Sequence, residues 1–383
     1  MKPSKNKRGI LMENRNIPEL MRCICGKKVE TAEEWNKFRR EEILALFSHF
    51  VYGVRPVGRP EDLEFTVLSE KEAAPGINCK EIRASFRGGG FNFSLYLPAG
   101  YVRNLPVFIY LMLQGQERVV DLDHDLESPN VPFAEIIRRN YGIAVLKSSQ
   151  VYPDEMYDVN YDPACRVDYR KGVFTLLERR DERNSASWAT ISAWSWAMSR
   201  VADYLEDAKE CDNKRIMVCG HSRGGKTALW CGATDKRIAL TISSCSGCSG
   251  AAITRGKRGE HVRNINGTDW FCRNYHRYND REEYLPVDQH MLLALMAPRA
   301  VYISSAELDD WADPQSEFLA CRMAGEAFEL LGKQGLVTED EEPVVDKLYH
   351  DGRIGYHMHD GPHRLRHEDW THYMDFADKL FAK

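Results

Sequence analysis

The segment 220–224, Gly-His-Ser-Arg-Gly, follows the spacing Gly-x-Ser-x-Gly, which sets a hydroxyl nucleophile between two glycines. The apolar run 216–219 predicts a strand before this segment, and residues 226–230 predict a helix after it. A strand, a sharp turn and a helix in this order hold the serine above the edge of a sheet, where its hydroxyl can attack a carbonyl carbon. The spacing therefore favours acyl-transfer chemistry at Ser222 over the alternative, a purely structural turn.

A turn of this kind places two demands on its neighbourhood. Small residues are needed where the strand and the helix approach each other, and the segment supplies Gly220, Gly224 and Gly225. The unbonded N–H groups at the start of the helix would face an oxyanion that forms beside Ser222. Both demands are met by the local sequence alone.

A serine nucleophile needs a base, and the base in such hydrolases is a histidine late in the chain. Three histidines lie together there: His357, His359 and His363. Residues 355–358 predict a short strand on which the first two alternate, whereas His363 follows Gly-Pro in a turn beyond it, so we expect His363 to be the base. With His367 and His372 nearby, the cluster also allows a metal site, but no other ligand-rich motif joins it and we expect none.

The histidine in turn needs a carboxylate to orient it. In chain order this residue should lie between the serine and the histidine, after a strand that we predict at 297–304. The loop that follows carries three aspartates: Asp309, Asp310 and Asp313. Asp309 lies at the expected distance beyond the strand and is the first candidate, with Asp310 as the alternative. Asp313 precedes Pro314, which is typical of a helix N-cap or a turn.

Three further segments carry residue types that are found in active sites. The loop after the apolar strand 106–113 is where a second oxyanion donor would lie, and its candidates are Gly115 and Gln116. Residues 150–185 are polar and rich in Asp, Tyr and Arg, and we interpret them as a surface excursion rather than a loop bordering the site. Cys245 and Cys248 form Cys-x-x-Cys, but no thioredoxin-like context surrounds them, so we expect a structural turn.

Predicted strands and helices alternate along the chain after residue 105, and this order indicates the fold that positions the candidate site residues. It indicates an α/β fold of the α/β-hydrolase type, a three-layer sandwich with a mostly parallel, doubly wound sheet. The alternating segments between residues 63 and 97 predict antiparallel strands at the start of the sheet. We expect residues 1–60 to form a tail and a helix packed on the main domain, and residues 61–383 to form the catalytic domain.

The overall composition excludes several classes of partner. A formal net charge of -5 over 383 residues gives no basic footprint for nucleic acid. No run of about 18 apolar residues predicts a membrane-spanning helix. The 11 cysteines are odd in number and scattered, which favours free thiols in a reducing compartment. With no secretory signal visible, we expect a cytoplasmic protein, or a secreted or periplasmic one if a leader was trimmed; the oligomeric state stays open.

The segment GHSRGGKTALW at 220–230 is more specific than the bare serine motif. It resembles the Gly-x-Ser-Arg-x-Gly-Lys motif of the glucuronoyl esterases, carbohydrate esterase family 15. The resemblance covers nearly all of the chain beyond about residue 26. Its other blocks are GCSGAAITRGKRGE at 247–260, DWFCRNYHRY at 269–278, LPVDQHMLLALMAPR at 285–299, DDWADP at 309–314 and GYHMHDGPH at 355–363.

The resemblance implies a serine esterase that cleaves an ester of the carboxyl group of (4-O-methyl-)glucuronic acid, with no metal or organic cofactor. The substrate would be a small or oligosaccharide uronate ester. Ser222 and His363 would act as a pair, and Arg223 would help to hold the oxyanion. Lys226, Glu260 and Trp311 would line the sugar pocket.

One position departs from the family pattern. Many members carry the acid of the triad as Glu just after the strand that follows the serine, and here that place is taken by Cys245. The acid must then come from the later loop, which adds weight to Asp309. The alternatives are an esterase for acetylated xylan, a carbohydrate-binding pseudoenzyme and, more weakly, a serine peptidase, since no propeller-like repeat precedes the hydrolase part.

Overall fold

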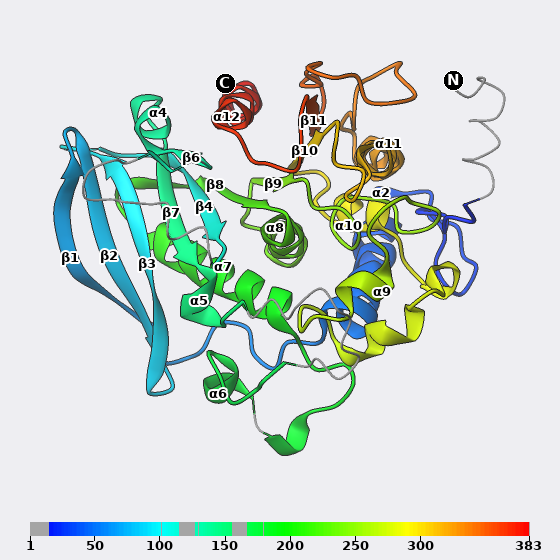
Figure 1. Ribbon diagram of the computed structural model, residues 1–383, viewed down its shortest axis with the longest axis horizontal. Helices are drawn as coiled ribbons and strands as arrows, with labels where there is room; N and C mark the ends of the chain where they lie inside the picture. Colours follow the sequence, from blue (N-terminus) through cyan, green and yellow to red (C-terminus); the bar gives the residue numbers. More distant parts are fainter. Residues whose placement is uncertain are drawn as a thin grey trace.

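The computed structural model of the protein describes residues 15–100, 102–114, 127–128, 130–154, 167–178 and 180–382. Over these residues nine strands form one sheet, which crosses the molecule in Figure 1. In chain order the strands are β1 (Glu64–Ala74), β2 (Ile77–Phe86), β3 (Gly89–Pro98), β4 (Leu105–Met112), β7 (Gly142–Lys147), β8 (Cys211–His221), β9 (Leu240–Ser244), β10 (Ala300–Ala306) and β11 (Ile354–His359). The short strands β5 (Glu127–Ser128) and β6 (Val131–Pro132) pair separately.

The order of the strands across the sheet is β1-β2-β3-β7-β4-β8-β9-β10-β11. The first three pair antiparallel with their neighbours, and β3 pairs antiparallel with β7. From β7 to β11 every pairing is parallel. The prediction of a doubly wound, mostly parallel sheet that begins with antiparallel strands is thereby confirmed.

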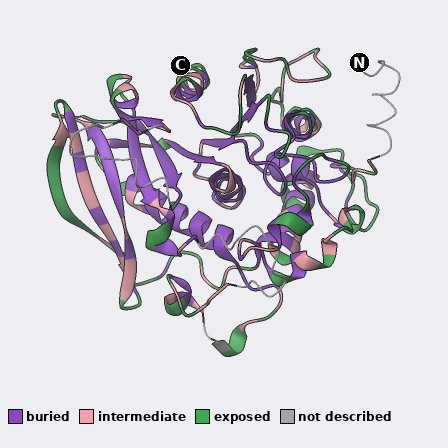
Figure 2. Ribbon diagram, viewed as in Figure 1, coloured by how far each residue is buried: buried purple, intermediate pink, exposed green. Residues whose placement is uncertain are grey.

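Strand β4 explains why the molecule has three layers. All eight of its residues are buried, and successive side chains point to opposite faces of the sheet. Val107, Ile109 and Leu111 join the hydrophobic core on one face, while Phe108 and Tyr110 join the core on the other. Each face must therefore be covered by helices, and Figure 2 shows the central strands buried while the edge strand β1 is largely exposed.

Two helices cover one face, and the other helices contribute to the core on the opposite face. The first pair is α4 (Phe133–Arg138) and α12 (His367–Phe381). The opposite layer contains α5 (Ser148–Val151), α6 (Phe174–Leu177), α7 (Thr190–Asp207), α8 (Arg223–Thr234), α9 (Val262–Ile265), α10 (Gln289–Ala294) and α11 (Pro314–Leu330). Short 3₁₀ turns lie at η4 (Arg180–Glu182), η5 (Arg273–Tyr278) and η6 (Glu282–Tyr284). None of the described helices is long and apolar enough to cross a membrane.

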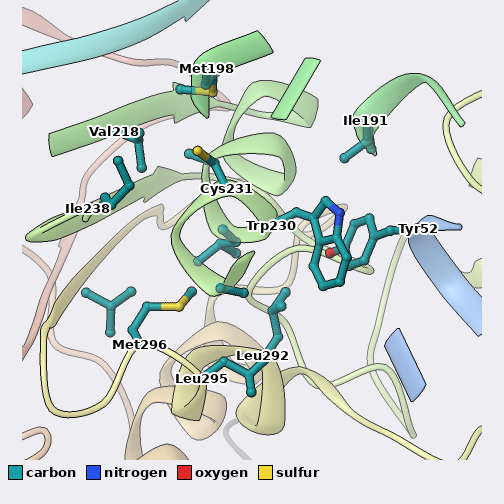
Figure 3. Packing of buried hydrophobic residues seen from close by; sticks show 14 of the residues in the cluster. Tyr52, Ile191, Met198, Val218, Trp230, Cys231, Ile238, Leu292, Leu295 and Met296 are labelled. Atoms are coloured by element: carbon teal, nitrogen blue, oxygen red, sulfur yellow. The ribbon is translucent and has the colours of Figure 1, made fainter. Parts of the chain in front are cut away.

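The predicted N-terminal helix is present and packs into the larger core. It runs through α2 (Ala32–Glu34), η1 (Trp35–Arg39), α3 (Arg40–Phe47) and η2 (Ser48–Tyr52), where η1 and η2 are π-helical. Its last residue, Tyr52, stacks on Trp230 of α8 with ring centroids 4.3 Å apart and an interplanar angle of 15° (Figure 3). The N-terminal segment therefore packs against α8, the helix that follows Ser222.

Parallel strands end at the same edge of a sheet, and this edge gathers the predicted site residues. Ser222 directly follows β8, and Cys245 directly follows β9. The loop 307–313 follows β10, and the loop 360–366 follows β11. Four segments that are far apart in the sequence therefore meet because their strands are neighbours in the order β8-β9-β10-β11.

Candidate active site

Ser222 occupies the turn between β8 and α8 in a conformation that few residues adopt. Its φ is 57° and its ψ is -126°, and its N–H donates to the carbonyl of Ser244 at 2.8 Å. A Cβ on Gly220 would lie 2.1 Å from the carbonyl oxygen of Gly224, so only glycine fits there. A Cβ on Gly224, in contrast, would meet nothing closer than 3.6 Å, so this glycine is not required by space. The turn is the sharp, strained type that exposes a nucleophile.

His363 and Asp309 form a close pair at this edge. Oδ2 of Asp309 lies 2.6 Å from Nδ1 of His363, and the imidazole is 41% exposed while the carboxylate is 3% exposed. Burial on its own would raise the pKa of Asp309, but the hydrogen bond and charge of His363 outweigh it and hold that pKa below its ordinary value. Oδ1 also accepts from the N–H of Ala312 at 3.1 Å. The carboxylate is thus ionised and fixed on both oxygens.

The other aspartates of the loop have different roles. Asp310 is exposed, and among the described residues it forms no hydrogen bond or ion pair with His363, which pairs with Asp309 instead. Asp313 is the N-cap of α11, where its side chain accepts from the N–H of Ser316 at 3.3 Å. The prediction that Asp313 caps a helix is confirmed, and only Asp309 is hydrogen-bonded to the predicted base.

The other two histidines of the cluster are structural neighbours of His363. His357 lies on β11 between the hydroxyl of Tyr302 at 2.9 Å and Oδ1 of Asp369 at 3.0 Å. The ring nitrogens of His359 face the carbonyls of Asp360 at 2.6 Å and Arg364 at 3.2 Å. The two contacts of His359 hold Asp360 and Arg364, which lie on either side of His363 in the turn.

His221 directly precedes Ser222, and its ring lies against the ring of His363. Its ring lies 4.6 Å from the ring of His363, centroid to centroid, and its Nδ1 is 3.2 Å from Oγ of Ser244. Burial, followed by the neighbouring His363, lowers the pKa of His221 to about 3. His221 is therefore neutral at working pH and adds no second positive charge beside the base. The sequence reasoning did not single it out.

Arg223 lies at the first position of α8, where its backbone N–H begins the helix. Its Nε donates to Oδ2 of Asp154 at 2.6 Å, and its guanidinium lies 5.7 Å from the ring centroid of Trp270. Asp154 is buried, so the interpretation of residues 150–185 as a surface excursion is wrong for this residue. Asp154 accepts the hydrogen bond from Nε of Arg223. Among the described residues, the two terminal nitrogens of Arg223 donate no hydrogen bond.

Lys226, Glu260 and Trp311 are joined in one chain of contacts. Nζ of Lys226 donates to Oε2 of Glu260 at 2.9 Å and to the carbonyl of Cys248 at 2.5 Å, and the lysine is buried. The N–H of Glu260 donates to the carbonyl of Trp311 at 2.8 Å. Trp311 itself is 53% exposed. A lysine has three donors, and among the described residues Nζ of Lys226 uses two of them.

Comparison with known proteins decides the family. A model of fungal glucuronyl esterases matches residues 171–332. The carbohydrate esterase MZ0003 of an unidentified prokaryotic organism is 36% identical over 395 residues, which span 94% of this chain and 89% of that protein. A CE15 esterase from a marine bacterial metagenome is 35% identical, with a TM-score of 0.84 over 95% of this chain and 97% of its own. The glucuronoyl esterase of Solibacter usitatus is 32% identical, with a TM-score of 0.85 over 96% and 98%.

The chain belongs to the glucuronoyl esterases, carbohydrate esterase family 15. It is therefore a carboxylic ester hydrolase with an α/β-hydrolase fold. The resemblance seen in the sequence motifs is confirmed over nearly the whole chain.

In this family member the position of the missing glutamate is occupied by a buried thiol. Cys245 has a φ of 46°, and burial raises the pKa of its thiol well above the ordinary value. Its Sγ donates to the carbonyl of Arg364 at 3.9 Å. Cys248 is also a free thiol, so the Cys-x-x-Cys segment is a turn and not a disulfide, as predicted. The oxyanion candidates Gly115 and Gln116 lie outside the described residues.

A second buried carboxylate, Glu317 of α11, lies behind the loops of the glucuronoyl esterase site. It accepts from the N–H groups of Ser246 and Gly247, each at 2.9 Å, and from the hydroxyl of Ser305 at 2.6 Å. Burial, opposed by these hydrogen bonds and reinforced by the charge of Asp309, raises the pKa of Glu317 to about 7. No motif in the sequence distinguished Glu317.

Proposed function

We propose that the protein hydrolyses esters of glucuronic acid and 4-O-methyl-glucuronic acid through a covalent acyl-enzyme. Membership of the glucuronoyl esterases supports the substrate class. The observation that carries the mechanism is the hydrogen-bonded pair of Asp309 and His363, which lies against the residue next to Ser222. A nucleophile, a base and an orienting acid on one edge of the sheet are what acyl transfer requires.

In this proposal Asp309 determines which ring nitrogen of His363 carries the proton. With the proton of neutral His363 on Nδ1, where it is donated to Asp309, Nε2 is left as the free lone pair. Nε2 takes the proton of Ser222 as the hydroxyl oxygen attacks the carbonyl carbon of the ester. The imidazolium then gives that proton to the departing alcohol. Nε2 next removes a proton from the water that attacks the acyl-enzyme, and returns it to Oγ of Ser222 as the bond between Oγ and the acyl carbon breaks and the free acid is released. The carboxylate of Asp309 stabilises the imidazolium throughout.

Arg223 supplies the stabilisation of the oxyanion. Its backbone N–H lies at the start of α8, where the first intrahelical bonds are donated by Gly225 and Lys226 rather than by Arg223. Its guanidinium is held by Asp154 through Nε, which leaves the terminal N–H groups for a developing negative charge. Fixed donors of this kind need no reorganisation when the charge appears.

The sugar side of the substrate is recognised by Lys226, Glu260 and Trp311. The remaining N–H of Lys226 and the carboxylate of Glu260 suit the hydroxyl groups of a pyranose ring. The exposed indole of Trp311 suits the apolar face of the same ring. These groups support a sugar beside the nucleophile, because Lys226 lies one turn along the helix that follows Ser222 and holds Glu260.

The decisive experiment is a substrate panel with the purified protein. We expect hydrolysis of benzyl and methyl glucuronate esters, little action on acetylated xylose, and loss of activity in Ser222→Ala with the fold retained. Preference for acetylated xylose would replace the proposal with an acetyl esterase. Absence of Ser222 labelling by a fluorophosphonate would indicate a carbohydrate-binding protein without catalysis.

A reducing compartment is the setting we propose for this reaction. The ten described cysteines are all free thiols, nine of them buried, in line with the expectation drawn from their number and scatter. Subcellular fractionation of the native source tests this, and recovery of the protein from the culture medium or the periplasm would contradict it.

A further inference from the structure

Three groups that bind soft or borderline metals meet beside the nucleophile. Cys245, Asp309 and His363 each offer one ligand atom, and these atoms lie within 4.8 Å of one another. The residues come from the loops after β9, β10 and β11, so adjacent strands bring them together. No other group of at least three such side chains occurs among the described residues.

The set of donors matches one class of cation. A thiolate, an imidazole and a carboxylate together are typical ligands of Zn²⁺, whereas Mg²⁺ and Ca²⁺ prefer oxygen ligands alone. Zinc bond lengths of about 2.0 to 2.3 Å place tetrahedral ligand atoms roughly 3.3 to 3.8 Å apart. The observed separations come within about 1 Å of that geometry, and the exposed imidazole of His363 has room to adjust.

We propose that Cys245, Asp309 and His363 form an inhibitory site for Zn²⁺, with a fourth position open to solvent or to Ser222. The metal takes no part in the proposed reaction, although two of its ligands, Asp309 and His363, are the proposed acid and base. The zinc proposal depends on the proposed function only for its claim that Zn²⁺ inhibits ester hydrolysis.

The electrostatic surroundings of Cys245 favour a cation. Asp309 is itself one of the three ligand groups, and the carboxylate of Glu317 accepts from the N–H of Ser246, the residue after Cys245, at 2.9 Å. A divalent cation bound here would compensate the charge of the thiolate that coordinates it. Access is through the exposed side of His363, because Cys245 and Asp309 are buried.

Binding of Zn²⁺ would prevent His363 from accepting the proton of Ser222. The thiol of Cys245 releases its proton to solvent as the sulfur–metal bond forms. If Nδ1 of His363 coordinates, the ring proton moves to Nε2, and the lone pair that would accept the proton of Ser222 is lost. If Nε2 coordinates, the same lone pair is occupied by the metal. Either mode also replaces the hydrogen bond between His363 and Asp309.

The test uses the full-length protein after removal of metals with a chelator. Cd²⁺, which binds like Zn²⁺ and reports sulfur coordination by an ultraviolet charge-transfer band, is titrated into the wild type, Cys245→Ser and Cys25→Ser. Cys25 is the matched control because it is the exposed cysteine among those described. We expect the band in the wild type and in Cys25→Ser, and its loss in Cys245→Ser.

Inhibition and stability are measured on the same three proteins. Zn²⁺ should inhibit ester hydrolysis reversibly in the wild type and raise its melting temperature. In Cys245→Ser the Zn²⁺ concentration for half-inhibition, relative to the metal-free rate of that variant, should rise by about tenfold or more. Asp309→Asn should weaken the Cd²⁺ band in parallel, which provides a second variant if Cys245→Ser folds poorly.

Two results would overturn the zinc site. One is a charge-transfer band that persists undiminished in Cys245→Ser, and the other is its absence from the wild type with Cd²⁺ in large excess over the protein. If the protein hydrolyses no ester at all, the proposed function fails instead, while the band still reports on the metal site.

Discussion

Oδ2 of Asp309 lies 2.6 Å from Nδ1 of His363, although 54 positions of sequence separate them. The two residues follow the parallel neighbours β10 and β11, which pair in register from Val301 with Ile354 to Ala306 with His359. The sheet therefore brings the acid to the base, and the side-chain bonds of Asp309 only complete the alignment.

Asp309→Asn should lower kcat on a glucuronate ester by about 10³- to 10⁴-fold with little change in KM. The amide can donate to Nδ1, which puts the ring proton on Nε2 and removes the free lone pair. Steady-state kinetics measure this, and Asp310→Asn is the control because Asp310 is exposed on the same loop. Equal losses in both variants would contradict the assignment of Asp309.

Asp154→Ala should lower kcat by roughly 10- to 100-fold, because Arg223 loses the partner that fixes its guanidinium. Asp154→Asn, which keeps an acceptor for Nε of Arg223, should recover much of this loss. Asp168→Asn is a control from the same polar region, since Asp168 pairs with the exposed Arg170. An Asp154→Ala enzyme with wild-type kcat would show that Asp154 does not position Arg223.

Trp311→Ala should raise the KM for glucuronate esters by roughly 5- to 30-fold, the effect of about 1 to 2 kcal/mol of lost contact with the sugar. The melting temperature should stay near the wild-type value because Trp311 is 53% exposed. Leu308→Ala removes another exposed apolar side chain, 67% exposed, from the same loop and is the control. The prediction fails if both variants change KM alike, or if Trp311→Ala affects only kcat.

Glu317→Gln should alter how stability depends on pH. The pKa of Glu317 is raised from 4.5 to about 7 in the fold, so the unfolded chain releases this proton at lower pH than the folded one. Between these values the wild type loses stability as pH rises, and the variant lacks this loss. From about pH 5 to pH 8 the variant should gain on the order of 1 to 3 kcal/mol relative to the wild type.

Urea unfolding of both proteins at several pH values measures this difference. Parallel stability curves would show that Glu317 does not change its protonation in this range. The hydrogen bonds from Ser246 and Gly247 can be kept by the carbonyl of the glutamine, so the fold itself should tolerate the substitution.

Local sequence was sufficient wherever the structural requirement was local. The strand, the turn and the helix around Ser222 are contiguous, so the spacing of glycine and serine reports their geometry directly. His363 could be selected because it follows the last strand in a turn, whereas His357 lies on the strand. Element boundaries were less exact: β10 begins at Ala300, three residues after the predicted start, because Ala297 still belongs to the turn after α10.

The sequence by itself determined the type of fold and predicted Ser222 as the nucleophile and His363 as the base, because alternating apolar runs and short motifs express these features within a few residues. Only the tertiary structure separated Asp309 from Asp310, since adjacent residues in an irregular loop carry no periodicity that tells which one turns inward. The same holds for Asp154, which meets Arg223 across 69 positions, and for the approach of Cys245 to the catalytic pair. Such contacts depend on the order of strands in the sheet, which no local pattern encodes.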